Sequence, residues 1–131
     1  IVNYVAVADA GVLYTHVLVE GQLQGGLMQG IGQVVGEHIV YDPANGQLLS
    51  GTFMDYFMPR AQLFPPLVLK DRGVPSPANP LGAKGAGEAG TTGSIPTLAN
   101  AVLDALKPLN VKHVEMPYTP SRIWRALHPA S

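Results

Sequence analysis

The chain has 131 residues, enough for one domain with a real but modest core. Its eight Lys and Arg and nine Asp and Glu give a net charge of −1 without any run of like charge, so nothing indicates a nucleic-acid or membrane-surface partner. Charged residues make up only 13% and apolar residues 47%, which predicts that part of the surface is normally covered.

The residue types in this chain argue against metal binding and thiol catalysis by its side chains. The chain contains no cysteine, which excludes disulfides, iron–sulfur clusters, Cys-ligated zinc and thiol catalysis within it. The four histidines are far apart and lack the HxH or HExxH spacing of metal sites. We therefore predict no metal ligand among the side chains.

The chain opens on a short apolar, β-branched run, residues 2–8, which predicts a strand that ends at the turn-prone Asp9–Gly11. The first residue is Ile1, and the opening residues have the pattern of a strand rather than that of a signal segment. We expect residues 1–131 to form a single domain that is a piece of something longer.

Residues 17–40 carry apolar side chains at helical spacing together with six glycines. Each glycine costs a helix roughly 1 kcal/mol relative to Ala, so packing has to recover the loss. We expect a buried helix with another backbone or a ligand close against its glycine face. Glutamines and Glu37 interrupt the segment every few residues, which argues against a membrane span.

The rest of the chain mixes strands and helices without a regular alternation. We predict a hairpin with strands 39–41 and 47–53, a strand over 63–68, a helix over 94–106 with Ser94 as N-cap, a strand over 111–116, and a final helix from Thr119-Pro120 to Leu127. The fold class expected is α+β: a mixed sheet with a long glycine-rich helix and a second helix packed on it.

The segment "NPLGAKGAGEAGTTG", residues 79–93, places one carboxylate, Glu88, among glycines. Gly85, Gly87 and Gly90 match GxGxxG literally, but no buried strand precedes them, and Lys84 is not followed by the Ser or Thr of a P-loop. Glycines let a backbone approach a flat or anionic ligand, and a carboxylate ahead of a helix can serve as general base. The alternative is a flexible surface turn with a solvated Glu88.

Four motifs, in order, resemble one known family: "VEGQLQGGLMQGIGQ", "TFMDYFMPRA", "PLGAKGAGEAG" and "MPYTPSRIWRAL". They look like the C-terminal region of the molybdopterin-binding large subunit of the xanthine dehydrogenase family, and most like its aerobic carbon monoxide dehydrogenase branch. The resemblance covers nearly the whole chain.

The resemblance implies hydroxylation of an electron-poor carbon, in an aldehyde, an N-heterocycle or carbon monoxide, with water as oxygen source. Glu88 would be the general base. The cofactor-binding positions implied form two groups. The first lies in the glycine-rich helix and consists of Gln22, Gly25, Gly26 and Gln29. The second lies in residues 84–88, the glycine loop, and consists of Lys84, Gly85, Ala86 and Gly87. The molybdenum would be held by molybdopterin, in its cytosine dinucleotide form, and not by side chains.

The implied partners are the upstream portion of the molybdenum subunit, iron–sulfur and flavin subunits or domains carrying 2Fe-2S clusters and FAD, and a small-molecule substrate. We expect a cytoplasmic protein, with any membrane or periplasmic association arising through partners. One departure is Leu13–His16, where relatives carry an Ile-Asn-Pro-like stretch. The alternative function is a non-catalytic assembly module or a cofactor-free remnant of the same family.

Overall fold

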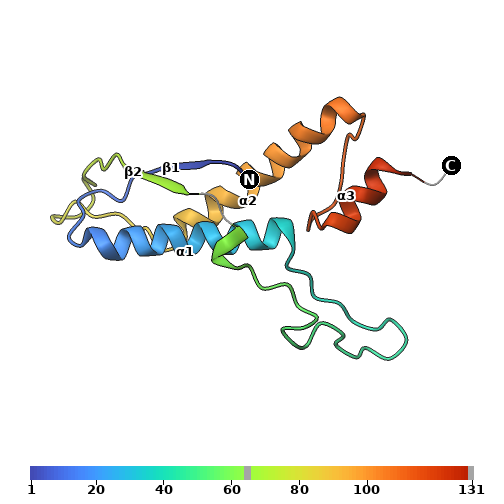
Figure 1. Ribbon diagram of the computed structural model, residues 1–131. Helices are drawn as coiled ribbons and strands as arrows, with labels where there is room; N and C mark the ends of the chain where they lie inside the picture. Colours follow the sequence, from blue (N-terminus) through green and yellow to red (C-terminus); the bar gives the residue numbers. More distant parts are fainter. Residues whose placement is uncertain (64–65, 130–131) are drawn as a thin grey trace. The chain divides into compact units, whose positions relative to one another are not determined.

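The computed structural model describes residues 1–63 and 66–129. Figure 1 traces the elements in chain order, which are β1 (Tyr4–Ala8), α1 (His16–Val35), η1 (Ala61–Leu63), β2 (Leu67–Asp71), α2 (Ala89–Leu106), η2 (Lys107–Leu109) and α3 (Pro120–Leu127). The chain forms two compact units. The first comprises residues 1–30 and 60–94, and the second comprises residues 31–59 and 95–131.

The first unit contains a small parallel sheet. β1 and β2 lie side by side, in a register that runs from Tyr4 opposite Leu67 to Ala8 opposite Asp71 (Figure 1). The first predicted strand is confirmed. The strand predicted over 63–68 begins later, at Leu67, and residues 64–65 of that prediction lie outside the described part of the chain. Pro66 has no N–H to donate to a ladder, which is consistent with a start immediately after it.

Two glycines bring the backbones of α1 and α2 together in the first unit. A Cβ atom on Gly26 would lie 2.9 Å from the Thr91 nitrogen and 3.1 Å from the Gly90 Cα. On Gly90 it would lie 2.6 Å from the carbonyl oxygen of Leu23. The predicted close approach of a second backbone to the glycine-rich helix is therefore confirmed at Gly26, beside the buried Leu23 and Leu27. The α+β class is confirmed as well.

The second unit has its own buried side chains, contributed by the end of α1, the later turns of α2 and the segment before α3. These are Ile31, Val34, Leu98, Leu106, Val114 and Tyr118. The Tyr118 N–H donates to the Val34 carbonyl over 2.6 Å. α3 begins as the sequence predicted, because the Thr119 hydroxyl accepts from the Arg122 N–H and Pro120 occupies the first helical position.

The predicted hairpin is only partly correct. The turn forms, with Asp42 N–H donating to the Gln47 carbonyl over 2.8 Å, but pairing is limited to one isolated bridge between Tyr41 and Leu48. The chain then returns to α1, where Phe57 packs on Gly36. The Tyr56 hydroxyl donates to the Glu37 carboxylate, and this hydrogen bond raises the pKa of Tyr56.

Two further predicted boundaries are wrong. α2 begins at Ala89 rather than after a cap at Ser94, and Ser94 is buried inside the helix with its hydroxyl donating to the Thr91 carbonyl. Residues 90–93 are poor helix formers, but the contact of Gly90 with α1 stabilises a longer helix than propensity predicts. Residues 111–116 form no strand, because no segment in the described part of the chain pairs with them.

Candidate functional site

Glu88 stands directly before the first turn of α2. Its carbonyl oxygen accepts a hydrogen bond from the Thr92 N–H over 3.0 Å, which makes Glu88 the residue from which the helix starts. The side chain is exposed, and its carboxylate has no hydrogen-bond or ion-pair partner in residues 1–63 and 66–129. The predicted position of Glu88 ahead of a helix is confirmed, and its role as a base stays a prediction.

The two glycines before Glu88 have no structural reason to be glycine. A Cβ atom on Gly85 or Gly87 would meet nothing within 4 Å, and neither residue has a positive φ. Gly82 differs, because its φ of +67° and its contacts with Val12 and Pro75 restrict a side chain there. No contact among the described residues therefore requires glycine at positions 85 and 87.

The predicted positions on α1 share one side of that helix. Gln22, Gly25, Gly26 and Gln29 follow the spacing i, i+3, i+4 and i+7, which places them in a single stripe. Gly26 lies in that stripe and contacts α2 at Gly90, two residues after Glu88. The stripe and the glycine loop therefore meet within the first unit.

The side chains of the stripe remain open. Gln22 and Gln29 are exposed, and a Cβ atom on Gly25 would meet nothing within 4 Å. The Thr91 hydroxyl lies 3.0 Å from the Gly26 carbonyl and 3.5 Å from the side-chain oxygen of Gln29. Gln29 thus lies beside the first turn of α2, where Glu88 is also placed. Two amide side chains and an open glycine can together present donors, acceptors and free backbone to a ligand.

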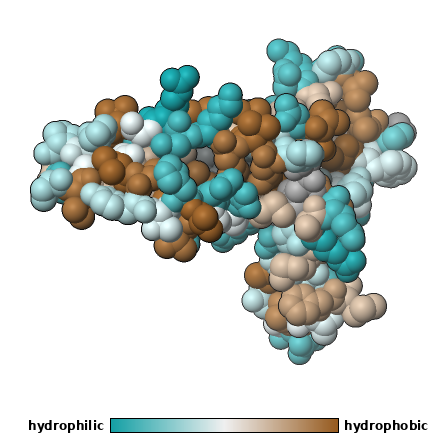
Figure 2. All heavy atoms as spheres, turned by 60° about the vertical axis from the view of Figure 1, so that its left-hand side comes forward, coloured by the Kyte–Doolittle hydropathy of each residue, from teal (hydrophilic) through white to brown (hydrophobic). Residues whose placement is uncertain are grey.

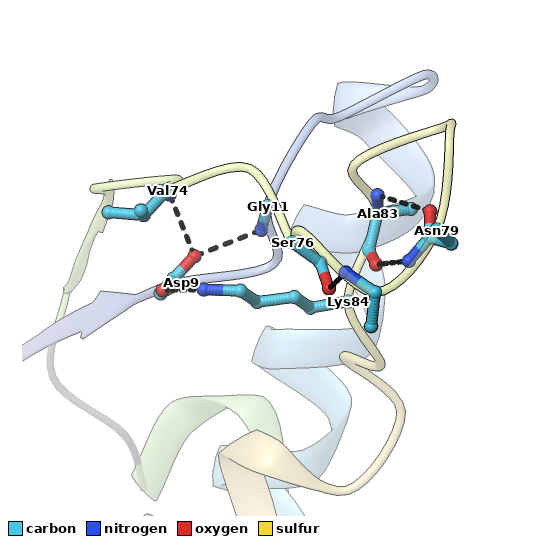
Figure 3. Close-up of polar contacts among 8 residues, drawn as sticks. Asp9, Gly11, Val74, Ser76, Asn79, Ala83 and Lys84 are labelled. Atoms are coloured by element: carbon cyan, nitrogen blue, oxygen red, sulfur yellow. Dashed lines mark hydrogen bonds and ion pairs between the residues drawn. The ribbon is translucent and has the colours of Figure 1, made fainter.

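Lys84, at the other end of the loop, is held by a residue that sequence reasoning missed. The Lys84 ammonium contacts the Asp9 carboxylate at 2.5 Å, and Asp9 also accepts hydrogen bonds from the N–H groups of Gly11 and Val74 (Figure 3). The hydrogen bond from Lys84, followed by those two backbone bonds, lowers the pKa of Asp9 from 3.8 to about 2. From the sequence, Asp9 was predicted only to belong to a turn, because no local pattern relates it to a lysine 75 residues later in the chain.

The segment before Lys84 is shaped by two other side chains. Asn79 brackets Ala83 through its side-chain amide, which donates to the Ala83 carbonyl over 3.0 Å and accepts from the Ala83 N–H (Figure 3). The Tyr14 hydroxyl donates to the Leu81 carbonyl over 2.9 Å. Through this hydrogen bond Tyr14 joins the segment before α1 to the turn that leads into the loop, 67 residues later in the chain.

Apolar side chains are exposed at many places in the described chain. Val5 and Val7 of β1 are more than half exposed, and so are Val17 and Leu18 of α1. Figure 2 shows hydrophobic residues at many places on the surface. Among the described residues, no three His, Asp or Glu side chains gather as a metal site, and no helix is long and apolar enough to cross a membrane.

Known proteins resemble this chain over almost all of its length. Residues 1–65 match the family described as molybdopterin cofactor-binding domain. The carbon monoxide dehydrogenase large chain of Hydrogenophaga pseudoflava is 40% identical over 125 residues, covering 95% of this chain and 15% of that protein. The nicotine 6-hydroxylase large subunit of Paenarthrobacter nicotinovorans is 39% identical over 121 residues, covering 92% and 15%.

A solved structure agrees with the sequence relatives. Quinoline 2-oxidoreductase from Pseudomonas putida 86 superposes with a TM-score of 0.92 at 37% identity, over 99% of this chain and 16% of that one. The chain thus spans about 15% of the length of the curated relatives that it matches.

Proposed function

Because this chain belongs to the molybdopterin-binding large-subunit family of xanthine dehydrogenase and aerobic carbon monoxide dehydrogenase, we propose that it forms part of a molybdenum hydroxylase. Its contribution is the general base, Glu88, and one side of the cofactor site. The observation that supports this most directly is the carboxylate of Glu88, without a partner among the described residues, beside two glycines that no contact among those residues explains.

The residues present are suited to a large flat cofactor. The backbone N–H groups of Gly85, Ala86 and Gly87 donate to no acceptor in residues 1–63 and 66–129, and the amides of Gln22 and Gln29 can donate and accept. Gly25 leaves room for close approach. We propose that these residues hold the cofactor in its cytosine dinucleotide form, with Gly26 setting the distance between α1 and the loop.

The cofactor, when bound, supplies the two-electron acceptor and the centre at which water becomes the oxygen source. The part of this chain in the reaction is proton transfer. A carboxylate oxygen of Glu88 accepts a proton from the group that attacks the substrate. The bare backbone of the loop leaves substrate and cofactor the space next to that oxygen.

The substrate class we propose is an electron-poor carbon in an aldehyde, an N-heterocycle or carbon monoxide. The names of the relatives include a nicotine hydroxylase and a carbon monoxide dehydrogenase, which supports this range without selecting within it. The remainder of the large subunit, together with subunits carrying FAD and 2Fe-2S clusters, completes the assembly in the cytoplasm. The second candidate, a non-catalytic assembly module or cofactor-free remnant, is favoured by the extent of exposed apolar surface alone.

The test is Glu88→Gln in the purified native assembly. The amide keeps the shape of the side chain but cannot accept the proton, so turnover falls by roughly 10²- to 10⁴-fold while molybdenum content stays unchanged. Glu115→Gln, at an exposed glutamate of the second unit, is the matched control and leaves turnover as it was. Full activity of Glu88→Gln would remove the base assignment, and loss of molybdenum with it would indicate a structural role instead.

A further inference from the structure

The cation at the start of the glycine loop is already engaged within the chain. Lys84 contacts Asp9 at 2.5 Å, and Asp9 lies just beyond the end of β1. A lysine in a loop next to a proposed anionic cofactor would ordinarily be assigned to that cofactor. Here its ammonium faces a carboxylate of its own chain (Figure 3).

Asp9 joins three segments that are distant in sequence. One carboxylate oxygen, Oδ1, accepts from the Gly11 N–H at 3.0 Å and from the Val74 N–H at 2.9 Å. The other, Oδ2, accepts from Lys84. The segment after β1, the segment after β2 and the entrance of the glycine loop therefore meet at one side chain.

Backbone contacts fix the same entrance. The Lys84 N–H donates to the Ala10 carbonyl over 3.0 Å, and Gly11 forms an isolated antiparallel bridge with Ala83. A Cβ atom on Gly11 would lie only 2.2 Å from the Gly82 carbonyl oxygen, so the backbones of these two segments are in close contact. At its far end the loop is fixed where Gly90 contacts α1.

Between these two fixed points lie only residues 85–89, which include Glu88. We propose that Asp9 is a positioning residue which, by holding Lys84, fixes the entrance of the loop that carries the base, and that Lys84 acts through this ion pair and not by direct contact with the cofactor. The consequence for catalysis rests on the proposed function. The ordering of the loop does not.

The size of the effect is expected to be local. The side chains of Lys84 and Asp9 remain 34% and 39% exposed, and exposed pairs contribute little to global stability. Five residues held at both ends are sensitive to even a small loosening at one of them. The ion pair should therefore be visible in the exchange of the loop amides rather than in the unfolding of the whole chain.

The experiment is amide hydrogen exchange of residues 85–89 in the purified native assembly, for Asp9→Asn, Lys84→Gln and the double variant. Each single variant is expected to speed exchange roughly two- to fivefold, the range typical of an exposed pair, and the double variant no further. Lys84→Arg, which keeps the cation, restores slow exchange. Asp104→Asn and Lys112→Gln, at exposed positions of the second unit, are the matched controls and leave this segment unchanged.

Unchanged loop exchange in Asp9→Asn, or additive effects in the double variant, would overturn the proposal. Molybdenum content separates the two roles of Lys84. If Lys84 contacted the cofactor directly, Lys84→Gln would lower molybdenum content while Asp9→Asn would not, which would also overturn it. Equal molybdenum content in the two variants supports positioning. Failure of the proposed function appears elsewhere, as unaltered turnover in Glu88→Gln or an assembly without molybdenum, while the exchange result stands.

Discussion

Glycines in this chain serve two different purposes. At Gly11 and Gly82 the backbone has a φ of +67°, and an added side chain would collide with neighbouring backbone or side-chain atoms. At Gly85 and Gly87 neither condition holds. The first pair is required by the fold, so the second pair is available for function, and it lies immediately before the carboxylate of Glu88.

The Asp9 carboxylate gives the first unit a specific dependence on acid. Its pKa is about 2 in the folded chain, against 3.8 for an unperturbed aspartate, so the folded state favours the ionised form. The stabilisation is therefore fully present when the pH is above 3.8, and it is lost as the pH falls through about 2. The measurement is urea unfolding at a series of pH values for the unmodified chain and Asp9→Asn.

We expect the difference in unfolding free energy between the two proteins to be constant near neutral pH and to shrink between pH 4 and pH 2. Asp104→Asn, at an exposed aspartate, is the control and lacks this feature. A difference that stays constant down to pH 2 would mean that Asp9 is not ionised by preference in the folded state.

At the scale of elements, three glycines of α1 test the contact with α2 and the open stripe separately. Gly26→Ala forces a Cβ against Thr91 and Gly90, and overpacking of this kind costs roughly 1–3 kcal/mol of unfolding free energy. Gly21→Ala and Gly25→Ala meet nothing within 4 Å, so each stabilises the helix by up to about 1 kcal/mol. Thermal or urea unfolding distinguishes the three.

Cofactor content then separates the two stabilised variants. Gly25 lies in the stripe proposed to face the cofactor, so Gly25→Ala lowers molybdenum content although it stabilises the chain. Gly21 lies outside the proposed contacts, so Gly21→Ala leaves molybdenum content as it is. Equal molybdenum content in these two variants would contradict the assignment of the stripe, and a stabilised Gly26→Ala would contradict the close contact with α2.

Sequence patterns predicted the elements whose signals are local. α3 begins at Thr119-Pro120 because both cap and first position are written in adjacent residues, and α1 was clear from its apolar spacing. The start of α2 was missed because it depends on Gly90 contacting a helix more than 60 residues earlier in the chain. The predicted strands 39–41 and 47–53 pair only at the bridge between Tyr41 and Leu48, and residues 111–116 form no strand, because strand formation needs a partner that an apolar run does not contain.

The candidate site likewise has one part that the sequence predicted and one part that it did not. Glu88 and its glycines could be found from a single stretch of sequence, and the structure adds that their backbone is open. The Asp9–Lys84 pair could not be found, since it joins residues 75 positions apart and exposed lysines and aspartates carry no pattern that pairs them. The roles of Gln22 and Gln29 remain predictions, although both lie in the stripe of α1 that meets the loop.

At the scale of the whole molecule, the chain carries the surface of a component rather than that of a finished protein. Large apolar side chains are exposed on β1, α1 and the segment before β2, among others. A parallel sheet of two strands is also far smaller than independent parallel sheets usually are. Relatives that match the chain are several times longer, which is consistent with a further polypeptide covering this surface.

The most direct test of the central claim is to purify the chain from its natural source without denaturation, measure molybdenum by elemental analysis and identify by mass spectrometry what accompanies it. Membership of a molybdenum hydroxylase predicts about one molybdenum per chain, together with the remaining large-subunit sequence and with subunits that carry flavin and iron–sulfur clusters. A folded chain that is purified alone and without molybdenum would contradict that claim, and the base assigned to Glu88 would then describe only its relatives.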